Sequence, residues 1–227
     1  MSVISVKGVE KTYNLEKIPV YALRGVDLEI QEGEFTAIVG PSGSGKTTLL
    51  NIIGGLDRPS KGEVLIGNEN INNLSDNKLI DFRKEHIGFV FQSFNLIPVL
   101  TAMENVEFIM MLQKRPKAER YARAKELLVE VGLSEKINKR PSELSGGQQQ
   151  RVAVARALAS KPTFILADEP TANLDSVSTS GLLDMMAELN QKEKITFVFS
   201  THDQRVIDRA RRVVTLIDGK IASDERR

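Results

Sequence analysis

Hydrophobic and polar positions follow two different rhythms along this chain. Short apolar runs rich in β-branched and aromatic residues predict strands at residues 4–6, 23–30, 35–39, 63–66, 87–91, 163–167, 196–200 and 213–217. The runs at 35–39, 163–167 and 196–200 are almost wholly apolar, which is typical of central strands covered on both faces. Because these strands alternate with helical patterns, the chain predicts an α/β fold with a largely parallel sheet.

Two other stretches repeat their apolar residues at helical spacing. Residues 117–131 have apolar side chains three and four positions apart and stop at Gly132. A second helix is predicted from about 147 to 160, ahead of Pro162. Residues from about 103 to 132 look helical and lie between the two sheet-forming parts of the chain, so we predict an inserted helical lobe at about 92–140.

Two tight turns predict antiparallel pieces at the sheet margins. Gly67-Asn68 and Asp218-Gly219 each lie between extended segments, as hairpin turns do. Residues 1–91 and 141–227 would then form the core of a single domain covering the 227 residues. We expect no regulatory domain after the second turn.

Composition limits the class of protein. A hydrophobic content of 41% and a charged content of 27% are ordinary for a soluble domain. A net charge of +1 gives no reason to expect a nucleic-acid partner, and the absence of cysteine excludes disulfides and Cys-ligated zinc. The first residues lack a signal-peptide pattern, and no apolar run approaches the roughly 18 residues of a membrane span. We therefore expect a cytoplasmic protein.

A glycine-rich turn between the strand at 35–39 and a helix-compatible segment at 47–53 predicts a P-loop. The turn and the residues after it are Gly40, Pro41, Ser42, Gly43, Ser44, Gly45, Lys46, Thr47 and Thr48. Glycines let backbone N–H groups approach phosphates, and the following helix adds its N-terminal N–H groups. Lys46 is predicted to reach the β- and γ-phosphates and the Thr47 hydroxyl to bind Mg²⁺. The alternative is a glycine turn that only caps a helix.

Two carboxylates follow the apolar strand predicted at 163–167. Asp168, at the strand end, suits Mg²⁺ binding, directly or through water. Glu169 comes next, where its carboxylate could polarise the water that attacks the γ-phosphate. The alternative is a solvated acidic turn before Pro170.

A second glycine-rich turn lies roughly a hundred residues after the P-loop. The P-loop is already a complete phosphate-binding loop, so this turn is not needed to bind the same triphosphate. It consists of Leu144, Ser145, Gly146, Gly147 and Gln148. On its own this is a capped helix start. With the P-loop and the acidic pair, it resembles the signature of ABC transporter nucleotide-binding subunits, a resemblance that covers nearly the whole chain. The resemblance implies that this turn closes on ATP held by a second copy, in a two-fold pair that binds two nucleotides.

The same resemblance implies roles for residues that say little on their own. Glu169 would be the general base, and His202, after the strand at 196–200, would contact the γ-phosphate and hold Glu169 and the water. Gln92, after the strand at 87–91, would reach toward Mg²⁺ and the attacking water and couple nucleotide state to rotation of the lobe. A surface histidine or glutamine is the alternative at each position.

Two further positions match the family's pattern. Tyr13 corresponds to the aromatic residue that stacks on adenine, although an ordinary edge-strand tyrosine would look the same. Asp175 lies in a loop that crosses the dimer interface. Ala172 stands where the family often has Ser or Thr, so the resemblance does not imply a hydroxyl contact there.

Longer strings at 49–57, 89–98 and 100–106 resemble the group of lipoprotein-releasing LolD and macrolide-exporter MacB ATPases. This implies a separate transmembrane permease and a peripheral position on the cytoplasmic face of a membrane. The apolar segment at 94–100 is a candidate docking site for the permease, with local packing as the alternative. An FtsE-like cell-wall regulator and a soluble, non-transport ABC ATPase remain alternatives, and the cargo is not predicted.

Overall fold

The computed structural model describes residues 2–14 and 18–227. In this part of the chain, six strands form a mixed sheet in the order β10-β9-β3-β8-β7-β6. Its strands are β3 (Phe35–Val39), β6 (Ile87–Phe91), β7 (Phe164–Asp168), β8 (Thr196–Ser200), β9 (Arg212–Ile217) and β10 (Lys220–Arg226). Strands β6, β7, β8, β3 and β9 are parallel, and β10 pairs antiparallel with β9. The predicted α/β class with a mostly parallel sheet is confirmed.

A second sheet is wholly antiparallel, in the order β2-β1-β4-β5. Its strands are β1 (Ser2–Tyr13), β2 (Val20–Gln31), β4 (Lys61–Ile66) and β5 (Glu69–Asn70). The predicted turn at Gly67-Asn68 therefore joins two strands of this separate sheet. The turn at Asp218-Gly219 joins β9 to β10 at the margin of the main sheet.

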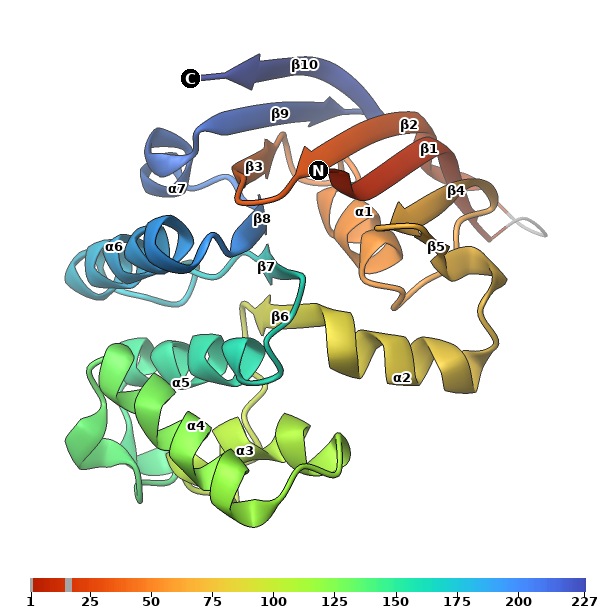
Figure 1. Cartoon of the computed structure of the whole chain (residues 1–227). Coiled ribbons are helices and arrows are strands. Elements are labelled where there is room, and N and C mark those ends of the chain that lie inside the picture. Colours follow the sequence, from red (N-terminus) through yellow and green to blue (C-terminus); the bar gives the residue numbers. More distant parts are fainter. Residues whose placement is uncertain (1, 15–17) are drawn as a thin grey trace.

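The helices surround the main sheet. They are α1 (Lys46–Ile53), α2 (Asp76–His86), α3 (Ala102–Leu112), α4 (Lys117–Glu130), α5 (Gly146–Ala159), α6 (Ser176–Glu193) and α7 (Gln204–Arg209). In Figure 1, α1 lies beneath the antiparallel sheet, whereas α3, α4 and α5 gather at the opposite end of the molecule. In the part of the chain described, no helix is both long and apolar enough to cross a membrane.

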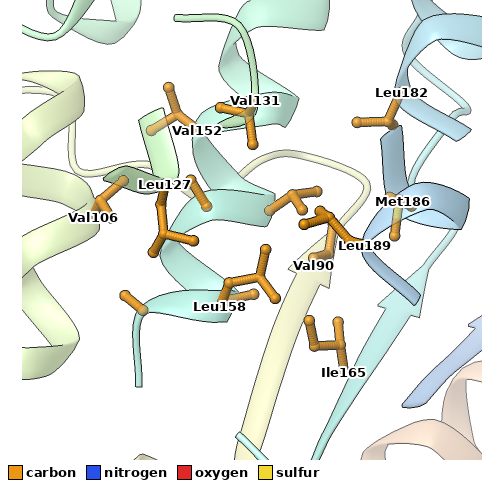
Figure 2. Packing of buried hydrophobic residues seen from close by; sticks show 14 of the residues in the cluster. Val90, Val106, Leu127, Val131, Val152, Leu158, Ile165, Leu182, Met186 and Leu189 are labelled. Atoms are coloured by element: carbon orange, nitrogen blue, oxygen red, sulfur yellow. The ribbon is translucent and has the colours of Figure 1, made fainter. Parts of the chain in front are cut away.

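Each face of the main sheet has its own hydrophobic core. In β7, Phe164 and Leu166 face α1 and the antiparallel sheet. The alternate residues Ile165 and Ala167 face the cluster built by α3, α4, α5 and α6. Figure 2 shows this second cluster. Central strands covered on both faces were predicted from their apolar runs, and the burial of β7 confirms this.

Candidate nucleotide site

The P-loop connects β3 to α1, and at several of its positions the backbone accommodates only glycine. Gly43 and Gly45 have φ values of 80° and 103°, in the left-handed region. A Cβ at Gly45 would overlap the carbonyl oxygen of Ala22, and one at Gly40 would overlap that of Leu216. The loop is therefore held closely against β2 and β9, with its glycines set by the surrounding backbone.

Lys46, the first residue of α1, is 9% exposed. Its ammonium group donates hydrogen bonds to the carbonyl oxygens of Gly40 (2.9 Å) and Pro41 (3.0 Å). The buried Ser44 hydroxyl has no hydrogen-bond partner in the described chain. A cationic donor, an orphaned hydroxyl and a helix N-terminus together suit a phosphate chain.

A cavity of about 660 Å³ opens above this loop. It brings together most of the predicted site residues, namely Tyr13, Gly40, Pro41, Ser42, Gly43, Gly45, Lys46, Thr47, Thr48, Gln92, Glu169 and His202. Val20 and Tyr21 of β2 also line it, and the sequence analysis did not predict them. Their exposed apolar side chains on a strand were the available signal, but such residues are common on protein surfaces.

Oxygen atoms that could bind a cation lie together where β7 ends and α1 begins. The Thr47 hydroxyl donates to a carboxylate oxygen of Asp168 at 3.1 Å. A hydroxyl beside a carboxylate and close to bound phosphate is the donor set that Mg²⁺ prefers, so these residues fit the predicted ion. Gln92 lines the adjacent cavity and adds an amide oxygen.

Glu169 and His202 form a close pair. The Nδ1 atom of His202 lies 2.7 Å from Oε1 of Glu169, and the Thr201 hydroxyl lies 3.4 Å from Oε2. The contact is a hydrogen bond from His202 to Glu169 in the tautomer that carries its hydrogen on Nδ1. The His202 side chain is 75% exposed and that of Glu169 is 17% exposed. The imidazole therefore covers a largely buried carboxylate from the side of the cavity.

Asp203 holds the segments behind this pair. Its carboxylate accepts a hydrogen bond from the Thr171 hydroxyl at 2.8 Å and binds the Arg205 guanidinium at 2.7 Å. These bonds, that of Arg205 first, lower the pKa of Asp203 from 3.8 to about 2. Since Thr171 follows the acidic pair and Asp203 follows His202, the contact joins the segment that carries Glu169 to the segment that carries His202. Sequence analysis gave Asp203 no role.

The second glycine-rich turn does not reach the cavity in this copy. Ser145 is the N-cap of α5 and forms a capping box with Gln148, with bonds of 3.0 and 3.3 Å. A Cβ at Gly147 would contact the Ser178 hydroxyl, because α6 begins nearby. Gly146 lies against the loop before α6. The structure thus separates Ser145, Gly146, Gly147 and Gln148 from the P-loop and leaves Ser145 exposed.

Asp175 also lies outside the residues that line the cavity. It is the N-cap of α6, and its carboxylate accepts from the backbone N–H of Ser178 at 2.8 Å and from its hydroxyl at 2.6 Å. Because Ser178 also lies against Gly147, the N-terminal ends of α5 and α6 are in contact.

Tyr13 stands at the rim of the cavity, fixed at its hydroxyl. The hydroxyl donates to Asp57 at 2.7 Å, and the Lys11 ammonium group lies 4.8 Å from the ring centroid. Burial and the hydrogen bond to Asp57 raise the pKa of Tyr13. The ring is thus held in one orientation beside the phosphate loop.

A P-loop beside a strand that ends in two carboxylates defines a nucleoside triphosphatase of the P-loop class. A sequence model of the ABC transporter family matches residues 23–172. The chain belongs to this family, as an ATP-binding cassette with ATPase activity. The resemblance drawn from the motifs is confirmed.

Relatives with known names match nearly the whole chain. The lipoprotein-releasing system ATP-binding protein LolD 1 of Rhodopseudomonas palustris is 48% identical, covering 97% of this chain and 98% of the relative. The macrolide export ATP-binding/permease protein MacB of Wolinella succinogenes is also 48% identical, over 96% of this chain but 34% of the relative. A solved dimeric, post-hydrolysis structure of the cassette MJ0796 of Methanocaldococcus jannaschii, bound to ADP and Pi, superposes with a TM-score of 0.90 at 48% identity and covers 98% of each chain.

Proposed function

We propose that two copies of this chain close head to tail on two ATP molecules and drive a separate membrane permease in a lipoprotein-release or macrolide-exporter-like complex. The observation that carries this proposal is the position of the second glycine-rich turn. Residues 145–148 form a glycine-rich helix start, a kind of backbone that can bind phosphate, but they lie outside the cavity of their own copy. In a two-fold pair it would meet the cavity of the other copy. The dimeric state of the related cassette MJ0796 supports this arrangement.

Within each shared site, the residues divide between binding and chemistry. Lys46 and the N–H groups of the P-loop would hold the β- and γ-phosphates, and the Tyr13 ring would stack on adenine. Thr47, Asp168 and Gln92 would hold Mg²⁺, whose charge stabilises the developing phosphate charge. Asp175 would lie at the interface between the copies.

Glu169 would act as the general base, accepting a proton from the attacking water. His202 supports this role because its contact with Oε1, together with that of the Thr201 hydroxyl with Oε2, fixes the orientation of the carboxylate at the cavity. Loss of the γ-phosphate would remove the bridge to Ser145 of the other copy and reopen the pair.

The permease would bind at an apolar hollow of about 350 Å³ beside the loop after β6. Asn95 and Ile97 of the predicted docking segment line it, with apolar side chains from β6 and α3 around them. Val99 in the same segment is 72% exposed. An apolar segment of a permease fits this surface, and MacB carries an ATP-binding part and a permease in one chain. We place the chain on the cytoplasmic face of the membrane, with residues 92–140 moving as a lobe.

The substitution Glu169→Gln tests the proposal. It removes the base but keeps a side chain of the same size, so ATP binding should persist while hydrolysis falls by about 10²–10⁴-fold. With both ATP molecules retained, the variant should sediment as a dimer at saturating Mg-ATP and as a monomer without nucleotide. Glu135→Gln, on the exposed turn after α4, is the matched control and should behave like the wild type. A Glu169→Gln protein that stays monomeric at saturating ATP, with or without its membrane partner, would falsify the shared-site proposal.

A further inference from the structure

The loop that follows β6 is fastened to α5 through its backbone carbonyls. Gln150 donates to the carbonyl of Phe91 at 3.2 Å, just before Gln92. Arg156 donates to the carbonyls of Phe94 at 2.9 Å and Asn95 at 2.5 Å, just after it. Side chains from a single helix thus hold the backbone on both sides of Gln92.

The backbone that Arg156 holds is in an unusual conformation. Phe94 and Asn95 have φ values of 60° and 49°, so two consecutive residues other than glycine are left-handed. Such residues persist where the surrounding structure fixes them. The tight turn between Ser93 and Asn95, closed by a 2.6 Å backbone hydrogen bond, directs both carbonyls toward the guanidinium.

In the part of the chain that the structure describes, Arg156 forms its hydrogen bonds with this loop. In the described chain its hydrogen-bond partners are both backbone carbonyls, and burial lowers the pKa of its guanidinium. The guanidinium is a rigid planar fork, so two of its nitrogen atoms donate to the two carbonyl oxygens in a fixed geometry, whereas a lysine ammonium group is a single point on a flexible stem. This favours a positioning role over a general electrostatic one.

The two ends of the held loop face different sites. Gln92 lines the nucleotide cavity, whereas Asn95, Ile97 and Arg156 line the apolar hollow. The Gln92 carbonyl accepts a hydrogen bond from Asn173 at 3.1 Å, and the chain before it is held at Phe91. A shift of the backbone at 94–95 would therefore fall on the short segment at 92–93 and change the setting of the Gln92 side chain.

We propose that Arg156 is a positioning residue for ATP hydrolysis: by fixing the left-handed turn at Phe94 and Asn95, it sets where the Gln92 side chain lies in the nucleotide cavity. The inference rests on the proposed role of Gln92. Arg156 itself does not line the nucleotide cavity, so it acts only through the loop.

The test compares Arg156→Met with Arg151→Met. Arg151 lies on the same helix and also donates to a backbone carbonyl, that of Val131 at 3.0 Å, but it does not touch the loop. Arg156→Met should lower kcat for ATP by about tenfold or more with the KM for ATP nearly unchanged, because small displacements of a positioned group reduce the rate strongly. Arg151→Met should keep kcat within about twofold. In addition, amide hydrogen exchange in Arg156→Met should rise at 93–97 and not in the P-loop.

A double-mutant cycle with Gln92→Ala decides whether the two residues act as one unit. If Arg156 acts through Gln92, the double variant should be no slower than Gln92→Ala alone. Fully additive losses, or an unchanged kcat in Arg156→Met, would overturn the inference while leaving the role of Gln92 intact. An unchanged kcat in Gln92→Ala would overturn both. If Arg156→Met does not fold, Arg156→Lys, which keeps the positive charge but not the planar guanidinium, should show a smaller loss of kcat with the same change in exchange. A wild-type kcat and exchange pattern in that variant would contradict the inference.

Discussion

Single residues in this site are fixed by neighbours that the motifs do not include. Glu169 has a φ of 45° and is held by its own N–H, which donates to the Ser200 carbonyl at 2.9 Å. His202 then approaches its carboxylate from the adjacent strand end. The geometry of the Glu169–His202 pair therefore depends on the register of β7 and β8 as much as on the two side chains.

Asp203 should make stability depend on pH in the acid range. Its pKa is about 2 in the folded protein against an ordinary value of 3.8, so the folded state favours the charged form. The contribution is complete above the unfolded-state pKa and is lost as pH falls through about 2. Because Arg205 is partly exposed, we expect Asp203→Asn to cost about 1–2 kcal/mol of unfolding free energy at pH 7.

Urea unfolding at pH 7 and between pH 4 and pH 2 measures this difference. The gap between wild type and Asp203→Asn should shrink steadily over the acid range. Asp208→Asn, at an exposed position on α7, is the control. A gap that is the same at every pH would show that the loss comes from packing and not from the charge.

At the scale of elements, the sequence predicted what its apolar runs determine. Strands β3, β6 and β8 begin and end where predicted, because each is a short apolar run between polar residues. Helices α2, α6 and α7 were not predicted. The first turns of α6 are rich in Ser and Thr, residues with weak helix propensity, and its helical state depends on Asp175 as cap and on buried Leu182 and Met186.

The residues of the site also divide into those that a local sequence pattern predicts and those that it does not. The P-loop and the acidic pair were predictable because each is a contiguous string at a strand end. Contacts such as Thr171 to Asp203 or Arg156 to Phe94 were not, because they join residues 32 and 62 positions apart. A side chain that binds a distant carbonyl leaves no pattern in the local sequence.

The start of α5 allows its capping role to be separated from the proposed contact with ATP. Ser145→Asp keeps a good N-cap, so the unfolding free energy should stay within about 0.5 kcal/mol of wild type. The new carboxylate would face the triphosphate of the other copy, so ATPase activity should fall by at least about tenfold. Ser145→Ala is the control for capping and should lose about 1 kcal/mol of stability. Normal ATPase activity in a stable Ser145→Asp protein would leave the turn with capping as its only role.

In the molecule as a whole, each copy carries two separate halves of the proposed ATP site, and neither half is complete on its own. The P-loop cavity is lined by residues of β2, the P-loop and the segments after β6, β7 and β8. The exposed N-cap of α5 lies outside this cavity, beside the loop before α6, and α5 itself packs with α3 and α4 (Figure 1). A two-fold pair would bring each half to its complement. In such a pair, Lys46 of one copy and Ser145 of the other would bind the same ATP molecule.

Mixing two inactive variants shows whether Lys46 of one copy and Ser145 of the other act on the same ATP. Lys46→Ala and Ser145→Asp each damage both sites of their own homodimers. A mixed dimer has one site with both substitutions and one site with neither. In an equal mixture with random pairing, half of the dimers are mixed, so about a quarter of all sites are intact. We predict that mixing the two proteins restores ATPase activity to about a quarter of wild type, whereas activity no higher than the average of the separate variants would contradict the shared site.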